Sequence, residues 1–288
     1  MLTQGTRPGN GTLCYRAGGT GRAVTYRMTV PDVTSPGVLR LGRRSFGPGQ
    51  LVIMAGAAGP VPGARGSGWD EAAAMDRVHA VVADGADIVD LGGGPAGAEM
   101  LGAGLAGAGM RGGGPAGAEE IRWAVPFVAA VRAAYPDLVI GVGAWRYETA
   151  RELCAAGADL LHDSGERLAQ VAAEYGAGLV CGNADRAVAR GVEPERVLID
   201  AGPGTRPSPE ATRRLEDMVA AGWPVLVPVP GPSRDGGRAG GLAATAVWAW
   251  LGVRVFRADQ VRNTRRVLDM VSAIRGDRPP ARAVRGLA

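Results

Sequence analysis

Short apolar runs alternate with longer mixed stretches along the chain from about residue 51 onward. The runs are rich in Val, Ile and Leu, as buried strands are, and the stretches between them are Ala-rich with a helical period. Eight strands are predicted, at 51–54, 87–91, 138–142, 159–161, 178–181, 196–199, 224–229 and 253–256. Helices are predicted at about 69–84, 118–134, 145–156, 165–175, 184–190, 208–221, 239–251 and 260–275.

Six glycines occur where a helix should end and the next strand begin. They are Gly85, Gly157, Gly176, Gly191, Gly222 and Gly252. Glycine tolerates the left-handed conformation that the position after a helix favours. Strands that alternate with helices predict a parallel α/β sheet with right-handed crossovers. Eight such units favour a closed (β/α)8 TIM barrel, and an open sheet of six or seven strands is the alternative.

The chain before the first unit has a different composition. Residues 1–37 are rich in Gly, Thr and Pro without a clear period, which predicts a flexible N-terminal extension. Residues 38–41 and 44–46 flank Gly42 and predict a small hairpin. The expected division is therefore an extension at 1–37 and a barrel domain at 38–288.

Charge and cysteine content narrow the function classes. The 32 basic residues are all arginine and are scattered, so the net charge of +4 predicts no nucleic-acid patch. No apolar stretch approaches the length of a membrane span, and the first residues lack the apolar core of a leader. Three cysteines without metal spacing fit a reducing compartment, so we expect a cytoplasmic protein with no membrane partner.

Polar side chains at the carboxyl ends of the strands are the candidate site, because barrel enzymes build their sites there. The candidates are Asp90, His162, Asp163, Asp200, Arg234 and Arg257, with Asn183 after the fifth strand. The carboxylates could accept from an amino-heterocycle, and the arginines could bind an anion. Structural roles are the alternative: Asp90 or Asp163 could cap a loop, and Arg257 could simply pair with Asp200.

One loop carries a local duplication. The sequence GGGPAGAE occurs at 92–99, after the second strand, and again at 112–119. Its small residues and single repeat do not fit a solenoid, and a duplication without function is the favoured interpretation.

Several strand motifs together resemble the dihydropteroate synthase family. Residues 84–93, DGADIVDLGG, resemble its second-strand motif, and residues 156–163, AGADLLHD, its fourth-strand motif. Residues 197–200, VLID, resemble the start of its sixth-strand Asp-Pro motif. The tail at 278–288 resembles the actinobacterial second-paralogue branch, and the resemblance runs in order from about residue 38 to the end.

The resemblance implies a (β/α) barrel, a homodimer and a pterin ligand. The family joins p-aminobenzoate to a hydroxymethyl-dihydropterin pyrophosphate, with Mg²⁺ assisting the departure of pyrophosphate. Asp200 would hold the pterin ring, Arg257 would lie by the pyrophosphate or stack on the pterin, and Arg234 stands where the family has a lysine.

The active-site motifs depart strongly from the family pattern. The metal-binding asparagine of the first loop is missing from 58–64, and the Ser-Thr-Arg-Pro of the second loop is replaced at 94–97. The third strand ends at 142–144 without its aspartate, His162 replaces the fourth-strand asparagine, and Asp259 replaces the last-strand histidine. Each lost charge-assisted hydrogen bond costs about 1.5–3 kcal/mol.

Such losses favour a catalytically impaired or inactive paralogue with a residual pterin or anion pocket. Two alternatives stay open on the sequence. The chain could be an active dihydropteroate synthase that uses substitute groups, with Arg234 for lysine and His162 for asparagine. It could also be a repurposed barrel enzyme for another anionic substrate. The catalytic residues, if there are any, are not identified by the sequence, and Mg²⁺ is implied by the resemblance alone.

Overall fold

The computed structural model describes residues 12–17, 24–29, 37–57, 70–91, 116–143, 146–163, 167–202, 205–230 and 237–278. The chain forms two compact units, Met1–Thr34 and Ser35–Ala288. Among the described residues, no helix combines the length and apolar character that a membrane crossing requires.

The first unit contains a ladder that the sequence did not predict. Strands β1 (Thr12–Ala17) and β2 (Val24–Thr29) pair antiparallel, with Tyr15 opposite Tyr26. Polar and apolar residues alternate along β2, and that alternation was the available signal for this ladder; β1 has Leu, Cys and Tyr in succession. We missed it because the flanking Gly, Thr and Pro residues obscured the period.

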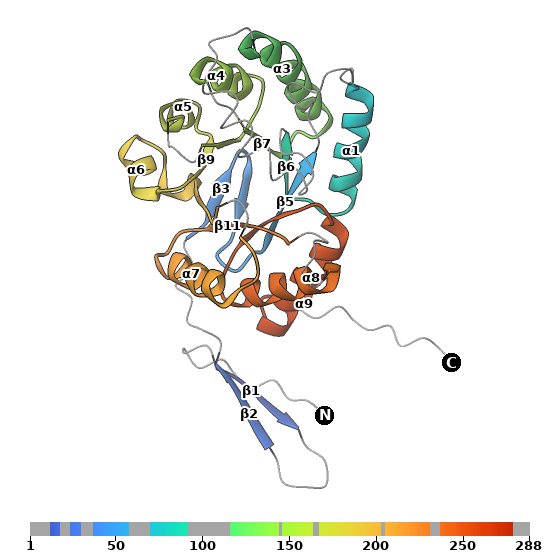
Figure 1. Ribbon diagram of the computed structural model, residues 1–288, viewed down its shortest axis with the longest axis vertical. Coiled ribbons are helices and arrows are strands. Elements are labelled where there is room, and N and C mark those ends of the chain that lie inside the picture. The colour runs from blue at the N-terminus through green and yellow to red at the C-terminus, as the bar shows by residue number, and fades with distance from the viewer. Residues whose placement is uncertain are drawn as a thin grey trace, which may run out of the picture. The chain divides into compact units, whose positions relative to one another are not determined.

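The second unit is a closed barrel of eight parallel strands, which confirms the predicted fold class (Figure 1). Strand β12 pairs with β5 and so closes the ring. No open-sheet edge is left in the ring, so the six- or seven-stranded alternative is wrong. The strands are β5 (Val52–Ala57), β6 (Ile88–Leu91), β7 (Val139–Gly143), β8 (Leu160–His162), β9 (Gly178–Cys181), β10 (Val197–Asp200), β11 (Val225–Pro228) and β12 (Val255–Ala258).

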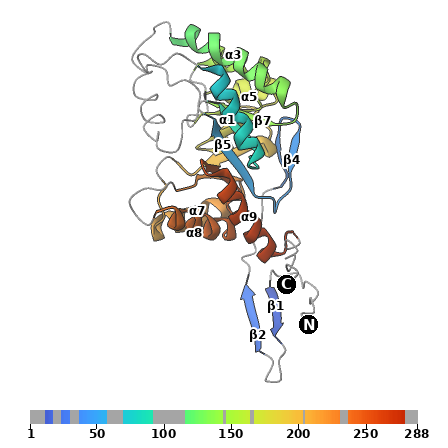
Figure 2. The ribbon, with the colours of Figure 1, turned by 90° about the vertical axis from the view of Figure 1, so that its right-hand side faces the viewer.

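Helices surround the strands, as Figures 1 and 2 show. They are α1 (Glu71–Ala83), α3 (Ala116–Ala134), α4 (Tyr147–Ala155), α5 (Ala169–Tyr175), α6 (Ala184–Ala189), the 3₁₀ turn η2 (Pro194–Arg196), α7 (Pro209–Ala220), α8 (Gly237–Trp250) and α9 (Val261–Arg275). The glycines predicted as helix stops have positive φ, 99° at Gly85 and 115° at Gly157. Helix α6 is short, as the brief segment between its flanking strands predicts.

A hairpin fills the amino-terminal end of the barrel. Strands β3 (Leu39–Leu41) and β4 (Arg44–Phe46) form it, where the sequence predicted a hairpin. Leu39, Leu41 and Phe46 are fully buried and share one apolar cluster with residues near the start of the barrel strands, among them Val52 and Ile88. This plug, residues 39–46, therefore seals the end of the barrel opposite the candidate site.

The fit between plug and barrel predicts the effect of a small substitution. A Cβ atom at Gly178 would lie 2.4 Å from Leu41 Cδ2 and 3.1 Å from the Arg196 carbonyl oxygen. We expect Gly178→Ala to lower the free energy of unfolding by about 1–2 kcal/mol, because overpacking forces neighbours to shift. Urea denaturation measures this, and Gly47→Ala is the matched control, because nothing lies within 4 Å of its added Cβ. Equal stability of the two variants would contradict the tight fit.

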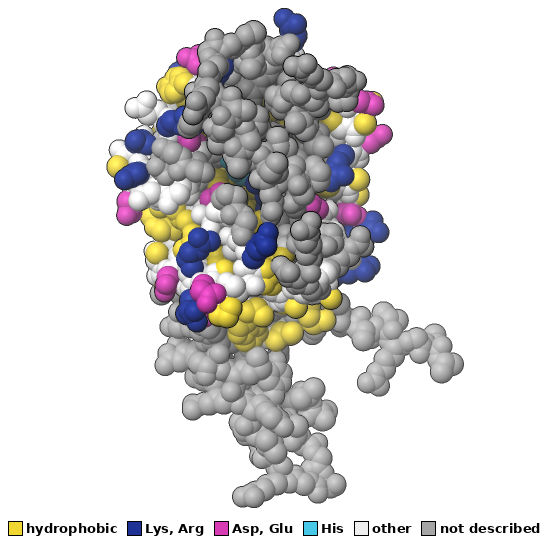
Figure 3. Space-filling view, in the orientation of Figure 1, with side chains coloured by type: hydrophobic (Ala, Val, Ile, Leu, Met, Phe, Trp, Pro, Cys, Tyr) yellow, Lys and Arg dark blue, Asp and Glu magenta, His cyan; other side chains and the backbone are white. Residues whose placement is uncertain are grey.

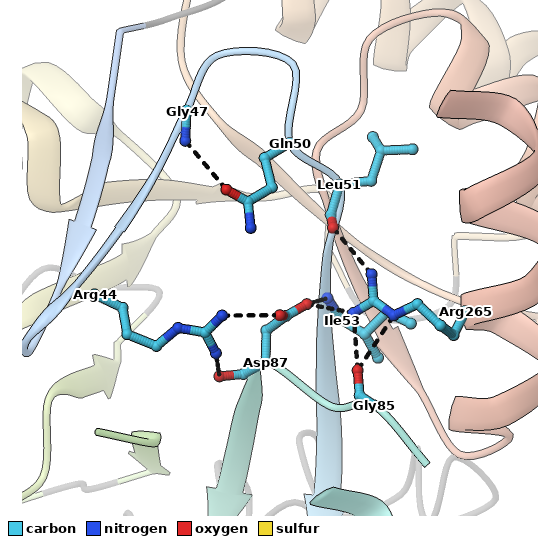
Figure 4. A network of polar contacts seen from close by, with 8 residues as sticks. All are labelled: Arg44, Gly47, Gln50, Leu51, Ile53, Gly85, Asp87 and Arg265. Carbon is cyan, nitrogen blue, oxygen red and sulfur yellow. Dashed lines mark hydrogen bonds and ion pairs between the residues drawn. The ribbon is translucent and has the colours of Figure 1, made fainter. Parts of the chain in front are cut away.

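Asp87 joins the plug, two strands and the last helix in one polar network (Figure 4). Its carboxylate accepts from the Ile53 amide at 2.9 Å and from Arg44 Nη2 at 3.2 Å, and it also pairs with Arg265 of α9. Arg265 also donates to the Gly85 carbonyl oxygen at 2.8 Å. The sequence Gly-Ala-Asp therefore fixes how β6 enters the barrel beside β5.

The same three-residue motif recurs two strands later with the same contacts. Asp159 accepts from the Ile140 amide at 3.0 Å and pairs with Arg132. Arg132 donates to the Gly157 carbonyl oxygen at 2.9 Å, as Arg265 does to Gly85. Burial raises the pKa of Asp159 and outweighs the lowering by the Ile140 amide and Arg132. Both motifs lie at strand entrances, away from the carboxyl ends, which gives them a structural role.

Arg254 holds the plug from the barrel side. It immediately precedes β12, is 2 % exposed, and donates to the carbonyl oxygens of Gly37, Phe46 and Gly47 at 3.1, 3.1 and 2.6 Å. Burial lowers the pKa of its guanidinium to about 10, so it remains charged at neutral pH. These bonds tie Arg254 to the end of the hairpin and to the residues on either side of it.

Candidate functional site

Four of the six predicted site residues lie together at the carboxyl ends of the strands. Asp90 comes from β6, His162 from β8, Asp200 from β10 and Arg257 from β12. Asp90 contacts both His162 and Arg257, and the charge of Asp200 acts on the ionisation of His162 and Arg257. Alternation along parallel strands of a closed barrel brings these residues, which are distant in sequence, to one mouth.

Asp90 is the buried centre of this group. Its side chain is 1 % exposed and forms an ion pair with Arg257, where the sequence had offered Asp200 as the possible partner of Arg257. Burial alone would raise the pKa of this carboxyl, but the attraction of His162 when that ring is protonated, and the charge and hydrogen bond of Arg257, outweigh burial and hold the pKa below its usual range. Asp90 is therefore ionised at neutral pH, with the guanidinium as its direct counter-ion.

His162 lies beside Asp90 as a neutral imidazole. Its Nε2 is 3.7 Å from Asp90 Oδ1, which is too long for a hydrogen bond, and this nitrogen makes no hydrogen bond to the described residues. Burial lowers the pKa of His162, more than the nearby carboxylates of Asp90 and Asp200 raise it. A buried nitrogen without a partner is costly, so this position favours a ligand that can supply a hydrogen bond.

Gly141 leaves room between these two side chains. A Cβ atom at this position would lie 3.6 Å from His162 Nε2 and 3.7 Å from Asp90 Oδ1. The glycine comes from β7, the strand between β6 and β8 in the ring. The sequence analysis missed it, since a glycine inside a strand signals a close approach only after its neighbours are known.

Arg257 faces more than one carboxylate. Asp90 raises its pKa most, burial opposes this, and Asp200 and Asp259 raise it further. Its side chain is 41 % exposed, so it reaches from the buried Asp90 toward solvent. Asp259 directly follows β12 and is a further member of the group that the predicted site did not include.

Asp163 and Asn183 do not join this group. Asp163 is buried and accepts from the Leu168 amide at 2.6 Å, while its other oxygen lies 3.8 Å from Arg167 Nε. Asn183 caps α6 by accepting from the Arg186 amide at 3.0 Å. Both contacts fit the structural alternative. Arg234 lies outside the described residues, as do the first GGGPAGAE copy and the loop at 58–69.

The described mouth does not fit a magnesium site. No group of three or more His, Cys, Asp or Glu side chains among the described residues could hold a metal ion. Asp90 directs one oxygen to Arg257, and Asp200 Oδ1 accepts from the Gly202 amide at 2.9 Å.

Charged side chains of both signs are scattered over the described part of the face drawn in Figure 3. The geometry defines the class of protein: a parallel eight-stranded barrel with a carboxylate-rich mouth built around one buried ion pair.

The comparisons with known proteins assign this barrel to a family. A family model described as pterin binding enzyme matches residues 64–187. The chain is 38 % identical to the inactive dihydropteroate synthase 2 of Mycobacterium tuberculosis, over 78 % of this chain and 82 % of that protein. The Mycobacterium leprae protein of the same name is also 38 % identical, over 78 % and 90 %. The chain belongs to the dihydropteroate synthase family.

Solved structures share the fold of this chain. The structure of Mycobacterium tuberculosis Rv1207 is 37 % identical and covers 85 % of this chain and 100 % of its own, with a TM-score of 0.65. A dihydropteroate synthase from Coxiella burnetii in complex with pteroic acid has a TM-score of 0.63 at 17 % identity, covering 84 % and 100 %. The second likeness supports the fold alone. The resemblance that the strand motifs indicated is thus confirmed.

Proposed function

We propose that this chain is a catalytically inactive paralogue of dihydropteroate synthase that keeps a pocket for a pterin-type ring. The single observation that carries this proposal is the ion pair between Arg257 and the buried Asp90. An arginine whose charge is already matched by a buried carboxylate gives little stabilisation to a departing pyrophosphate. The mycobacterial relatives named inactive support the same conclusion.

The remaining groups suit binding better than bond breaking. Asp200 offers a carboxylate to the amino and ring N–H groups of a pterin, and the neutral His162 offers a buried nitrogen that needs a partner. Gly141 leaves the space of about one methyl group beside His162 and Asp90. The proposed ligand-binding residues are Asp90, His162, Asp200 and Arg257, with Arg234 kept as a proposal and Asp163 as a support of the loop before α5.

The proposal extends to the oligomeric state and the cellular location of the protein. We infer a cytoplasmic homodimer, in line with the family resemblance. Val247 near the end of α8, and Met270 and Ile274 near the end of α9, are large apolar side chains that are 51 %, 61 % and 42 % exposed. Helices α8 and α9 pack together, so a second copy could cover this apolar surface. Analytical ultracentrifugation of the wild type and Met270→Glu tests the dimer.

An activity assay tests the proposed function. We expect no dihydropteroate to form from hydroxymethyl-dihydropterin pyrophosphate, p-aminobenzoate and Mg²⁺, and no growth of a synthase-deficient strain that carries this chain. We also expect calorimetry to detect binding of hydroxymethyl-dihydropterin to the wild type. Binding to Asp200→Asn should be at least about tenfold weaker, because a charge-assisted hydrogen bond is lost.

The controls separate loss of chemistry from loss of the pocket. Asp217→Asn, at an exposed position of α7, should bind as the wild type does. Growth of the deficient strain without folate products would overturn the assignment as inactive. Absence of any pterin binding by a folded protein would overturn the retained pocket.

A further inference from the structure

The ladder of β1 and β2 has two faces of different character. Directly opposed residues of an antiparallel ladder lie on the same face, and successive residues alternate between the faces. The register therefore places three pairs on one face, namely Leu13 with Met28, Tyr15 with Tyr26, and Ala17 with Val24. All six residues are apolar or aromatic, and this face is called the apolar face below.

The opposite face of the ladder is polar and basic. It carries Thr12, Cys14 and Arg16 from β1, and Thr25, Arg27 and Thr29 from β2. Neither strand contains an acidic residue, so the two arginines carry the whole charge of the ladder. Two such basic faces repel each other, whereas the apolar face is uncharged.

A sheet of two strands requires a second layer over its apolar face. An isolated two-stranded hairpin is only marginally stable in water, because a single layer buries too little apolar surface. The ladder belongs to a compact unit of its own, Met1–Thr34. The cover for its apolar face therefore has to complement a flat, uncharged surface of about this size.

The order of residues on the apolar face complements a second copy of the same face. Leu13 and Met28 form a large pair at one end, Ala17 and Val24 form a smaller pair at the other, and the two tyrosines lie between them. In a second ladder that faces the first with its ends reversed, Ala17 lies over Leu13 and Val24 lies over Met28. Large residues facing small ones fill the space between two layers evenly.

The charges favour the same arrangement. When two apolar faces meet, the basic faces point away from each other, on the outer sides of sheets that pack about 10 Å apart. Solvent-exposed charges at such a separation are largely screened, since the Debye length at physiological salt is about 8 Å. Edge-to-edge pairing of the two ladders would instead leave the apolar face uncovered.

The area of the apolar face limits how strongly two ladders can pair. Strands of six residues span about 20 Å and two strands about 10 Å, so the face covers roughly 200 Å² per copy. Two copies contribute roughly 400 Å², against at least about 1,200 Å² in a stable interface. The ladders therefore need a further contact between the two copies, which then holds them at an effective concentration in the millimolar range.

We propose that the apolar face of the ladder is an interface between two copies of this chain, in which the ladders stack face to face with their ends reversed. This inference rests on the homodimer of the proposed function, because contacts between the barrels supply the further contact that the ladders need. The N-terminal extension then has a definite role, which is to form a second interface within the dimer and slow its dissociation.

Photo-cross-linking of the full chain tests this inference. Tyr26→benzoylphenylalanine keeps an aromatic ring on the apolar face and links, on illumination, to whatever lies against it. Thr25→benzoylphenylalanine is the matched control, because Thr25 adjoins Tyr26 and lies on the opposite face. We expect at least about tenfold more covalent dimer with the probe at Tyr26, linked between the β1–β2 segments of the two copies.

Ultracentrifugation of the same samples separates the possible failures. A dimer without links between ladders overturns this inference and leaves the homodimer intact, whereas a monomer overturns both. Links from the Tyr26 position into the barrel of the same chain show that the barrel covers the face, and they overturn the second copy as occupant. Equal yields of covalent dimer at both positions overturn the choice of face.

An exchange of residue sizes tests the reversed ends. With the probe at Tyr26, Ala17→Leu should lower the yield of covalent dimer at least about fivefold, because two large residues then face each other. Adding Leu13→Ala should restore the yield to within about twofold, since large again faces small. Leu13 and Ala17 are not opposed within one ladder, so packing inside a single copy does not predict this rescue. A double variant as poor as the single one overturns the reversed arrangement.

Discussion

Replacing Arg254 by methionine is expected to lower the free energy of unfolding by about 3–4 kcal/mol, the largest effect predicted here. The substitution keeps much of the apolar stem but removes the donors to the carbonyl oxygens of Gly37, Phe46 and Gly47. Phe46 is buried and Gly47 is half-buried, so water cannot readily replace the bonds to their carbonyl groups, whereas Gly37 is exposed. Urea denaturation followed by circular dichroism measures the change.

Arg262→Met is the matched control. Arg262 pairs with Asp84, but its side chain is 69 % exposed, so we expect a change below about 0.5 kcal/mol. If Arg254→Met were no more harmful than Arg262→Met, the carbonyl contacts of Arg254 would not hold the plug.

Replacing Arg257 by methionine is expected to destabilise the protein by about 2–3 kcal/mol at pH 7, because it leaves the buried Asp90 charge without its counter-ion. This destabilisation is smaller than that expected for a fully buried ion pair, because the Arg257 side chain is 41 % exposed and water reaches part of it. The double variant Asp90→Asn, Arg257→Met should recover part of the loss, since no charge is then buried. Parallel urea titrations of the single and double variants measure this.

The pH dependence of these variants follows from the pKa of Asp90. In the wild type this pKa is lowered, so Asp90 contributes stability that is present above its unfolded pKa and is lost as pH falls through the folded value. Without Arg257, burial raises the pKa, and the ionised carboxylate then costs stability at neutral pH. We therefore expect the deficit of Arg257→Met to shrink between pH 7 and about pH 4. A deficit that grows on acidification would contradict this assignment.

The scaffold followed from the sequence because its signals are local and repeated. All eight strands lie within a few residues of their predicted positions, and the glycines at 85 and 157 take the conformations that their places require. Apolar runs and helix stops depend on neighbours in the chain, so they can be read from it directly. The plug hairpin was predicted as an element, but its packing inside the end of the barrel was not. That packing brings Leu41 against Gly178, and these two residues are distant in sequence.

The candidate site was predicted only in part. The rule that polar groups gather at strand ends placed Asp90, His162, Asp200 and Arg257 in one mouth. It did not show that Arg257 would form its ion pair with Asp90 rather than with Asp200, since that depends on the side-chain conformation of Arg257 within the barrel. It also gave no means of separating Asp163, which supports a loop, from residues open to a ligand.

Two arginines three residues apart meet opposite requirements: Arg254 immediately precedes β12, and Arg257 lies within it. Arg254 anchors the sealed floor, while Arg257 belongs to the open rim. Substitutions should therefore cost stability unevenly along this short segment, with Arg254 at the floor more sensitive than Arg257 at the rim. A chain of this design can lose one reaction and acquire a different ligand specificity by substitutions at the rim. The residues that stabilise the fold, at the floor, then remain unchanged.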